Sequence, residues 1–196
     1  MVLRLVTSED TTAALLERAR RRDEAALGEL WSRYAVMVRR LLQRTLGPDD
    51  ATEDLTQDVF VRFVEGLGRV RDETSLQSWL VSVTLNSARS ALRRRRRWRW
   101  ALTRLGRHDD VSPQRPDTSL AMHRLFNLLD QLDEEERLAF VLRHLEELEL
   151  ADVARHLDCS LATVKRRLVS ARGRLERLAS NDLHIREFLR QGGSHD

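Results

Sequence analysis

Arginine and tryptophan side chains are concentrated in the segment SALRRRRRWRW, residues 90–100, which contains six arginines and two tryptophans. Guanidinium groups bind phosphate through charge and paired hydrogen bonds, and indole rings stack on bases. The segment therefore has the residue types that contact with a nucleic acid requires. We assign its arginines to phosphate contact only, because such a run binds without reading sequence. For Trp98 and Trp100, packing beneath the following linker is the alternative to stacking on a base.

A second basic segment, LADVARHLDCSLATVKRRLVSARGRL at residues 150–175, has the spacing of a helix-turn-helix. A short helix would end at Leu157. Asp158, Cys159 and Ser160 would form a three-residue turn, and Ser160 would also cap the next helix. On a helical wheel of this next helix, the buried side would carry Val164, Leu168, Ala171, Leu175 and Leu178.

The opposite side of that helix carries small residues around one long donor, Arg166. Small residues allow close approach to a groove, and a guanidinium can make a bidentate contact with guanine. We therefore predict that Arg166 reads a base. Lys165, Arg167 and Arg172 lie on the flanks of this helix side, where they would contact phosphates. The remaining side chains of the predicted interface are Ser160, Thr163 and Ser170. The alternative is a helical hairpin whose basic face is merely solvated.

The composition favours helix throughout, since Ala, Leu, Glu and Arg are abundant and the chain has only eight glycines and three prolines. We predict an all-α protein with two helical domains joined by a flexible linker. The first domain would cover residues 8–100, the linker 101–118, the second domain with the helix-turn-helix 119–181, and a tail 182–196. Prolines and turn-forming residues without apolar periodicity mark the linker.

Local signals place the helices within these domains. Gly47 would end a long helix that begins near residue 25, and Thr52 is a candidate cap for the next. A loop at residues 71–75 would precede the helix that continues into the arginine run. In the second domain, Asp133 and Glu136 have the spacing of a capping box.

The charge pattern predicts two contacts with one polyanion. The net charge is only +3, but residues 93–107 contain eight arginines and no acid, and residues 160–177 contain six bases and one acid. Between them, residues 119–158 contain ten acids and four bases. Two basic surfaces on an otherwise balanced chain are typical of a protein that grips a nucleic acid at two places.

Several function classes are excluded by the sequence. Cys159 is the only cysteine, which rules out an intramolecular disulfide and fits a reducing compartment. No run approaches the roughly 20 apolar residues of a membrane helix, and we predict a cytoplasmic protein without membrane insertion. The histidines lack metal-ligand spacing, and no glycine-rich phosphate loop is present. We therefore predict no enzyme activity, no catalytic residues, no metal and no cofactor.

Three segments, in order, resemble the extracytoplasmic-function (ECF) sigma factors of bacterial RNA polymerase. ATEDLTQDVFVRFVEGL resembles the helix that docks on the clamp helices of the largest polymerase subunit. SLQSWLVSVTLNSARSALRR resembles the segment that recognises and opens the minus-10 promoter element. LDQLDEEERLAFVLRHLEELELADVARHLDCSLATVKRRLVSARGRL resembles the reader of the minus-35 element. The resemblance implies a transcription initiation factor whose partners are core RNA polymerase, promoter DNA and an anti-sigma factor.

The resemblance also implies roles for individual residues. The polymerase-binding residues would be Asp54, Gln57, Asp58 and Val61. The minus-10 residues would be Arg71, Thr74, Ser75, Asn86, Arg89, Arg93, Arg94, Arg96 and Arg97, with the loop at 71–75 and Asn86 around an unstacked base. Trp79 matches a family position but falls on the apolar stripe, which favours core packing.

The sequence departs from the family pattern at four positions. Asp158 stands where a turn glycine is usual, and we expect the turn to survive because Asp tolerates a left-handed backbone. Ser90 stands where Asp is frequent. Arg166 replaces a small residue and Ser170 replaces an arginine, so the minus-35 sequence need not be the usual one. The rival functions are a dimeric helix-turn-helix regulator that binds duplex DNA without polymerase, and an adaptor that has lost DNA binding.

Overall fold

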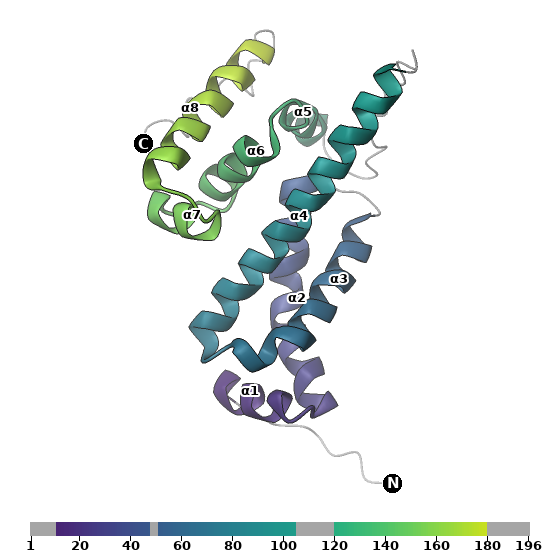
Figure 1. Cartoon of the computed structure of the whole chain (residues 1–196), viewed down its shortest axis with the longest axis vertical. Helices are drawn as coiled ribbons and strands as arrows, with labels where there is room; N and C mark the ends of the chain where they lie inside the picture. The colour runs from purple at the N-terminus through teal and green to yellow at the C-terminus, as the bar shows by residue number, and fades with distance from the viewer. Residues whose placement is uncertain (1–10, 48–50, 105–119, 180–196) are drawn as a thin grey trace.

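The computed structural model describes residues 11–47, 51–104 and 120–179. Within these ranges every regular element is helical and none is a strand, which confirms the all-α prediction. Most of the predicted linker lies outside the described residues. Figure 1 shows α5 to α8 grouped on one side of the molecule. Helix α4, the last helix of the first group, lies against them.

The first domain is a bundle of four helices. Their bounds are α1 (Thr12–Arg20), α2 (Glu24–Leu46), α3 (Ala51–Gly66) and α4 (Glu73–Arg104), with a 3-10 turn at Leu67–Arg69 before α4. Asp23 caps α2 by accepting hydrogen bonds from the backbone N–H groups of Ala25 and Ala26, and these bonds lower the pKa of its carboxyl. Gly47 ends α2 with a φ of 84°, as its position predicts.

Apolar residues at helical spacing make the core of this bundle. Leu30, Val38 and Leu42 of α2 pack with Val59 and Phe63 of α3, all with at most 1% of their surface exposed. Trp79 of α4 is partly buried against this core, and its ring lies so close to Gly66 that a Cβ there would be 2.2 Å from it. The expected packing role of Trp79 is confirmed.

Two local predictions in this domain are wrong. Thr52 lies inside the first turn of α3 and is buried, and its carbonyl accepts a hydrogen bond from Thr56 Oγ1, so it is not the cap. The predicted loop at residues 71–75 is mostly helix, because α4 already begins at Glu73. The reason is a reciprocal pair: the Asp72 carboxylate accepts from the Ser75 N–H at 2.8 Å, and Ser75 Oγ accepts from the Asp72 N–H at 2.9 Å. Helix α4 also continues four residues beyond residue 100.

The second domain contains four further helices and a π-helical turn at Val141–Leu145. The helices are α5 (Leu120–Leu129), α6 (Glu134–Phe140), α7 (Leu150–His156) and α8 (Leu161–Leu178). The Glu136 side chain accepts from the Asp133 backbone N–H at 3.3 Å, as the predicted capping box requires. The turn between α7 and α8 survives with Asp158 at a φ of 49°, in the left-handed region.

Helix α8 buries the predicted stripe with one exception. Val164, Leu168, Ala171 and Leu175 are at most 4% exposed, whereas Leu178 is 47% exposed. The prediction for Leu178 is wrong because α8 ends at that residue.

The two domains share one apolar core. Residues of the second domain belong to the same buried cluster as α2, α3 and α4, among them Leu138, Leu142, Val153, Leu157 and Leu168. Helix α6 lies against α4, which brings the start of α6 to the arginine-rich half of α4 (Figure 1). Among the described helices, none is long and apolar enough to cross a bilayer.

Candidate nucleic-acid interface

The outer face of α8 is open to solvent. Lys165 and Arg166 are exposed, and Val169 beside them is 74% exposed. Within the described part of the chain, no hydrogen bond or ion pair holds either cation. Ser160 caps the helix by accepting from the Thr163 backbone N–H at 3.2 Å, which confirms the predicted N-cap. This face can therefore approach a groove without first breaking an intramolecular contact.

The flanking residues of α8 are engaged by acids. Arg167 is 22% exposed and its guanidinium lies 3.0 Å from Glu135 Oε2. Arg172 pairs with Glu176 one turn on at 2.9 Å, and Ser170 Oγ donates to Glu136 Oε1 at 2.6 Å. Only the Lys165 and Arg166 side of the predicted minus-35 surface is thus presented without a competing partner.

The predicted minus-10 residues lie mostly along one side of α4. Asn86, Arg89, Arg93, Arg96 and Arg97 recur at three- and four-residue spacing, so they share a face. Ser75 is on the same face, about 16 Å from Asn86 along the axis at 1.5 Å per residue. The structure therefore brings these side chains into a row rather than around one pocket. Arg71 and Thr74 are exposed at the start of the helix, and Arg94 is exposed beside the row.

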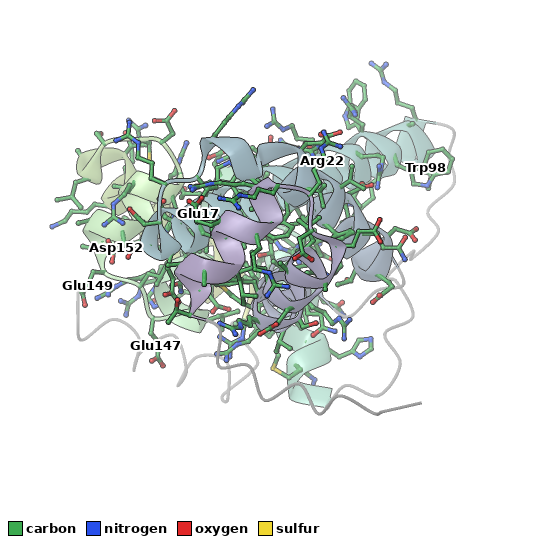
Figure 2. The ribbon with its side chains drawn as sticks, turned by 90° about the horizontal axis from the view of Figure 1, so that it is seen from below. Glu17, Arg22, Trp98, Glu147, Glu149 and Asp152 are labelled. Atoms are coloured by element: carbon green, nitrogen blue, oxygen red, sulfur yellow. The ribbon has the colours of Figure 1, made fainter. Side chains whose placement is uncertain are left out.

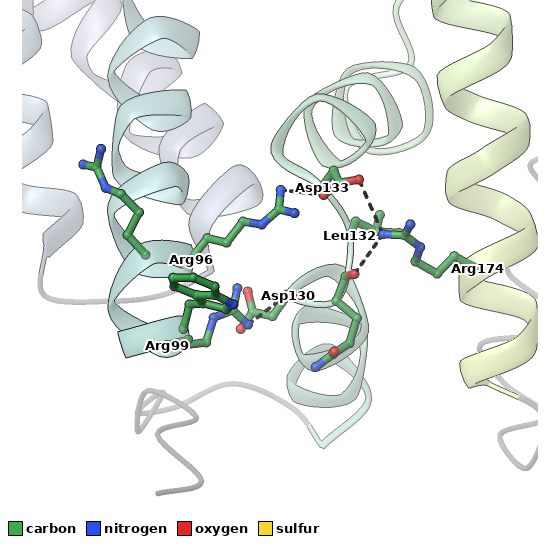
Figure 3. A pocket seen from close by; sticks show the side chains of 9 residues that line it. Arg96, Arg99, Asp130, Leu132, Asp133 and Arg174 are labelled. Carbon is green, nitrogen blue, oxygen red and sulfur yellow. Dashed lines mark hydrogen bonds and ion pairs between the residues drawn. The ribbon is translucent and has the colours of Figure 1, made fainter. Parts of the chain in front are cut away.

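The arginines of this row differ in what they contact. Arg93 and Arg97 are exposed. Arg89 is 15% exposed, donates to Asn86 Oδ1 at 2.7 Å, and lies 2.5 Å from Glu135 Oε1 of α6. Arg96 lies 2.6 Å from Asp133 (Figure 3). It also lies 3.2 Å from Glu134. Two of the four arginines in the row, Arg89 and Arg96, are therefore paired with carboxylates of the second domain.

Several arginines donate to backbone carbonyls at helix ends. Among them are Arg95 and Arg99 of the arginine run, which we predicted to contact phosphate, and Arg137, which the sequence did not single out. Arg95 donates to the carbonyl of Leu46 at 2.8 Å, at the end of α2. Arg99 donates to the carbonyl of Asp130 at 2.9 Å (Figure 3). Arg137 is fully buried and donates to the carbonyl of Thr45 at 2.5 Å. Each binds a carbonyl at or near the end of a helix, a role that composition alone cannot separate from phosphate contact.

The two tryptophans of the arginine run project into solvent. Trp98 is 64% exposed and Trp100 is 62% exposed, with the Arg104 guanidinium 3.9 Å above the ring of Trp100. Figure 2 shows Trp98 at the far end of α4, on the opposite side of the molecule from Glu147 and Glu149. The linker residues that would cover them lie outside the described ranges, so both roles considered for these rings stay predictions.

Helix α3 presents the predicted polymerase face. Asp54, Gln57, Asp58 and Val61 are all exposed, and Val61 is 53% exposed. They lie opposite the side that buries Val59 in the core. The structure leaves this face open to solvent, and its contact with polymerase stays a prediction.

In the described ranges, no group of three His, Cys, Asp or Glu side chains is placed to hold a metal ion. Burial and the neighbouring Arg155 lower the pKa of His156 in α7.

Comparisons with known proteins match both domains. The model of sigma-70 region 2 matches residues 30–98, and that of sigma-70 region 4 matches residues 122–175. The ECF RNA polymerase sigma-E factor of Haemophilus influenzae is 30% identical over 178 residues, which are 85% of this chain and 94% of that protein. The ECF RNA polymerase sigma factor SigM of Mycobacterium tuberculosis is 30% identical over 175 residues, 87% of this chain and 85% of that protein.

Two solved structures share the fold. CnrH, solved in complex with the cytosolic domain of CnrY, has a TM-score of 0.59 and 24% identity over 86% of this chain and 96% of its own. The sigma factor RpoE of Bartonella quintana, solved with the anti-sigma factor NepR, has a TM-score of 0.58 and 23% identity over 79% of this chain and 97% of its own.

Proposed function

Because the chain belongs to the extracytoplasmic-function sigma factors, we propose that it joins core RNA polymerase, directs the enzyme to promoters and opens them there. The observation that carries the proposal is the presence of both sigma regions, in order, on one chain whose basic faces are exposed in each region. A helix-turn-helix regulator that works without polymerase is not favoured, since it has no use for region 2. The chain itself catalyses nothing and acts in the cytoplasm, where the polymerase supplies the chemistry.

The polymerase contact is assigned to the exposed face of α3. Asp54, Gln57, Asp58 and Val61 would meet the clamp helices of the largest subunit. The support is their shared exposure on a helix whose other side is committed to the core. Charged groups around Val61 would set orientation, and burial of the valine would supply apolar area.

The minus-35 contact is assigned to α8. Arg166 would read a guanine in the major groove, and Lys165 and Arg172 would bind phosphates. Ser160, Thr163, Arg167 and Ser170 would complete the contact near the helix start and along its flank. The support is the open position of Lys165 and Arg166.

The minus-10 contact is assigned to α4 and the residues that begin it. Arg71, Thr74 and Ser75 would hold an unstacked base at the start of α4, and Asn86, about 16 Å further along the helix, would contact a neighbouring nucleotide. The phosphates would be bound by Arg89, Arg93, Arg94, Arg96 and Arg97. Capture of an unstacked base compensates for the few kcal/mol that unpairing costs, so the duplex can open without a nucleotide-driven motor.

An anti-sigma factor is the third proposed partner. The two structural relatives were solved with CnrY and with NepR, and NepR is an anti-sigma factor. We extend this kind of regulation to the present chain.

Transcription in vitro tests the proposal. Core polymerase and a genomic promoter library would be transcribed with and without the purified chain, and permanganate would map unpaired thymines. We expect new start sites and melted minus-10 segments only when both proteins are present. New start sites that fail to appear, or binding that is equally specific without polymerase, would reject the initiation role.

A further inference from the structure

The segment that joins α3 to α4 is held by a side chain of α1. Arg20, the last residue of α1, donates from Nη2 to the carbonyl of Val70 and to the carbonyl of Arg71, the latter at 3.1 Å. Its Nη1 binds Glu17 one turn back in the same helix. Figure 1 shows α1 at the end of the bundle where α4 begins. We call Arg20 with its two carbonyl contacts the α1 anchor.

The same segment is held from the α4 side by Ser75. Its Oγ accepts from the backbone N–H of Arg71 at 3.1 Å and from that of Asp72 at 2.9 Å. The carbonyls of Val70 and Arg71 lie between the 3-10 turn and α4, outside both helices, and Arg20 supplies their donor. Polar backbone groups of residues 70–72 are thus bound by two side chains, one from α1 and one from α4.

The anchored segment carries side chains to which the proposed function assigns an unstacked base. Arg71 and Thr74 are exposed, whereas Val70 is 4% exposed and packs in the core of the first domain. The side chain of Arg20 is 26% exposed, and its guanidinium is committed to the backbone and to Glu17. Arg20 therefore acts on the segment and not directly on DNA.

We propose that Arg20 is a positioning residue for base capture: it fixes the backbone at Val70 and Arg71, so that the exposed side chains of Arg71 and Thr74 are already in place when a base leaves the duplex. The role rests on the proposed function for the captured base. The physical reason is preorganisation. A segment that is ordered only on binding lowers affinity by about five- to thirtyfold for each residue whose backbone must be fixed.

Two substitutions remove the α1 anchor in different ways. Arg20→Gln removes the guanidinium and its charge. Arg20→Lys keeps the charge but not the planar fork that serves two carbonyls, so it separates anchoring from attraction of phosphate. The matched control is Arg21→Gln, which removes the same charge from the next residue, an exposed one. Circular dichroism and binding to core polymerase would verify that each variant is folded and keeps its polymerase contact.

Hydrogen–deuterium exchange of the free chain measures the anchor itself. The backbone amides of Arg71 and Asp72 are bound by Ser75 Oγ, and they exchange faster when the segment opens more often. We expect exchange in a peptide of residues 70–76 to be about threefold faster in both Arg20 variants and unchanged in Arg21→Gln. A wild-type rate in both Arg20 variants would overturn the anchor.

Binding of holoenzyme to single-stranded DNA measures the consequence for base capture. The probe is the labelled nontemplate strand of a minus-10 segment mapped by the transcription assay, prepared intact and with one base at a time replaced by an abasic site. The captured base is the position at which its removal weakens wild-type binding most. We expect both Arg20 variants to bind the intact strand about fivefold more weakly and to bind the strand abasic at that position as the wild type does.

A residue that only stabilises the fold would give a different result, because its loss would weaken both strands equally. That equal weakening, wild-type affinity of Arg20→Lys for the intact strand, or a fivefold loss in Arg21→Gln would each overturn the positioning role. A wild-type holoenzyme that binds none of these strands would reject the proposed function, and with it the role of Arg20 in base capture. Faster exchange in the Arg20 variants would in that case still establish the anchor.

Discussion

Replacement of Arg137 by methionine tests the buried contact between the two domains. The side chain is 1% exposed, its Nε donates to the carbonyl of Thr45 at 2.5 Å, and its guanidinium pairs with Asp130. Methionine is flexible and fills a similar space. The substitution therefore removes the polar contacts and keeps most of the packing.

The expected decrease in the free energy of unfolding follows from the hydrogen bonds that Thr45 and Asp130 lose. A hydrogen bond to a charged group contributes about 1.5–3 kcal/mol, and Arg137 makes one to Thr45 and one to Asp130. Asp130 is 17% exposed and recovers part of its hydration, whereas Thr45 is fully buried. Removal of a buried charge also relieves its desolvation cost. The balance predicts a free energy of unfolding lower by about 2–3 kcal/mol.

Urea unfolding at pH 7, followed by far-UV circular dichroism, measures this loss. The control is Arg155→Met, since Arg155 is 63% exposed and pairs only at the surface with Asp152. We expect the control to stay within about 0.5 kcal/mol of the wild type. A loss in Arg137→Met no larger than that of the control would refute the assignment of Arg137 as an interdomain contact.

Three other predictions concern DNA reading, pH and packing. Arg166→Ala should relax specificity at one minus-35 position at a cost of about 1–3 kcal/mol, whereas Lys165→Ala should weaken all sites alike in competition binding; a base preference altered by Lys165→Ala would contradict this assignment. Burial lowers the pKa of His156 from its ordinary 6.5, so the folded state binds the proton less readily than the unfolded state. The contribution of His156 to the free energy of unfolding should therefore be constant above about pH 6.5 and decrease at lower pH. An equal decrease in the His156→Gln variant would show that another group causes this pH dependence. Gly66→Ala should lower the melting temperature, because its Cβ would lie 2.2 Å from the Trp79 ring, and the double variant with Trp79→Leu should recover part of the loss.

Features set by near neighbours could be predicted from the sequence. The cap at Ser160 and the pairing of Asp133 with Glu136 follow from short spacings that leave few alternatives. The buried stripe of α8 follows from helical periodicity. The predictions were wrong where the exact end of a helix decides whether a residue is buried or helical. Leu178 is exposed because α8 ends there, and Ser75 belongs to the first turn of α4 rather than to a loop.

The exposed residues of α3 and α8 could also be predicted, because a helix with one apolar stripe must present its other side. Val61 and Arg166 are examples. Periodicity does not tell what an exposed charge contacts, since a charge of the opposite sign can arrive from any distance along the chain. The pairing of Arg89 with Glu135 joins residues 46 positions apart.

Local sequence signals were enough to predict helical domains, a capped helix-turn-helix and two basic surfaces, because propensity, capping and periodicity act within a few residues. Which arginines are exposed and which are bound to carboxylates depends on how the helices pack. Arg97 and Arg96 are neighbours of the same type, yet Arg96 meets Asp133 because α6 docks on α4 through a shared apolar core. That docking depends on the three-dimensional fit of two helix faces, which no local pattern encodes.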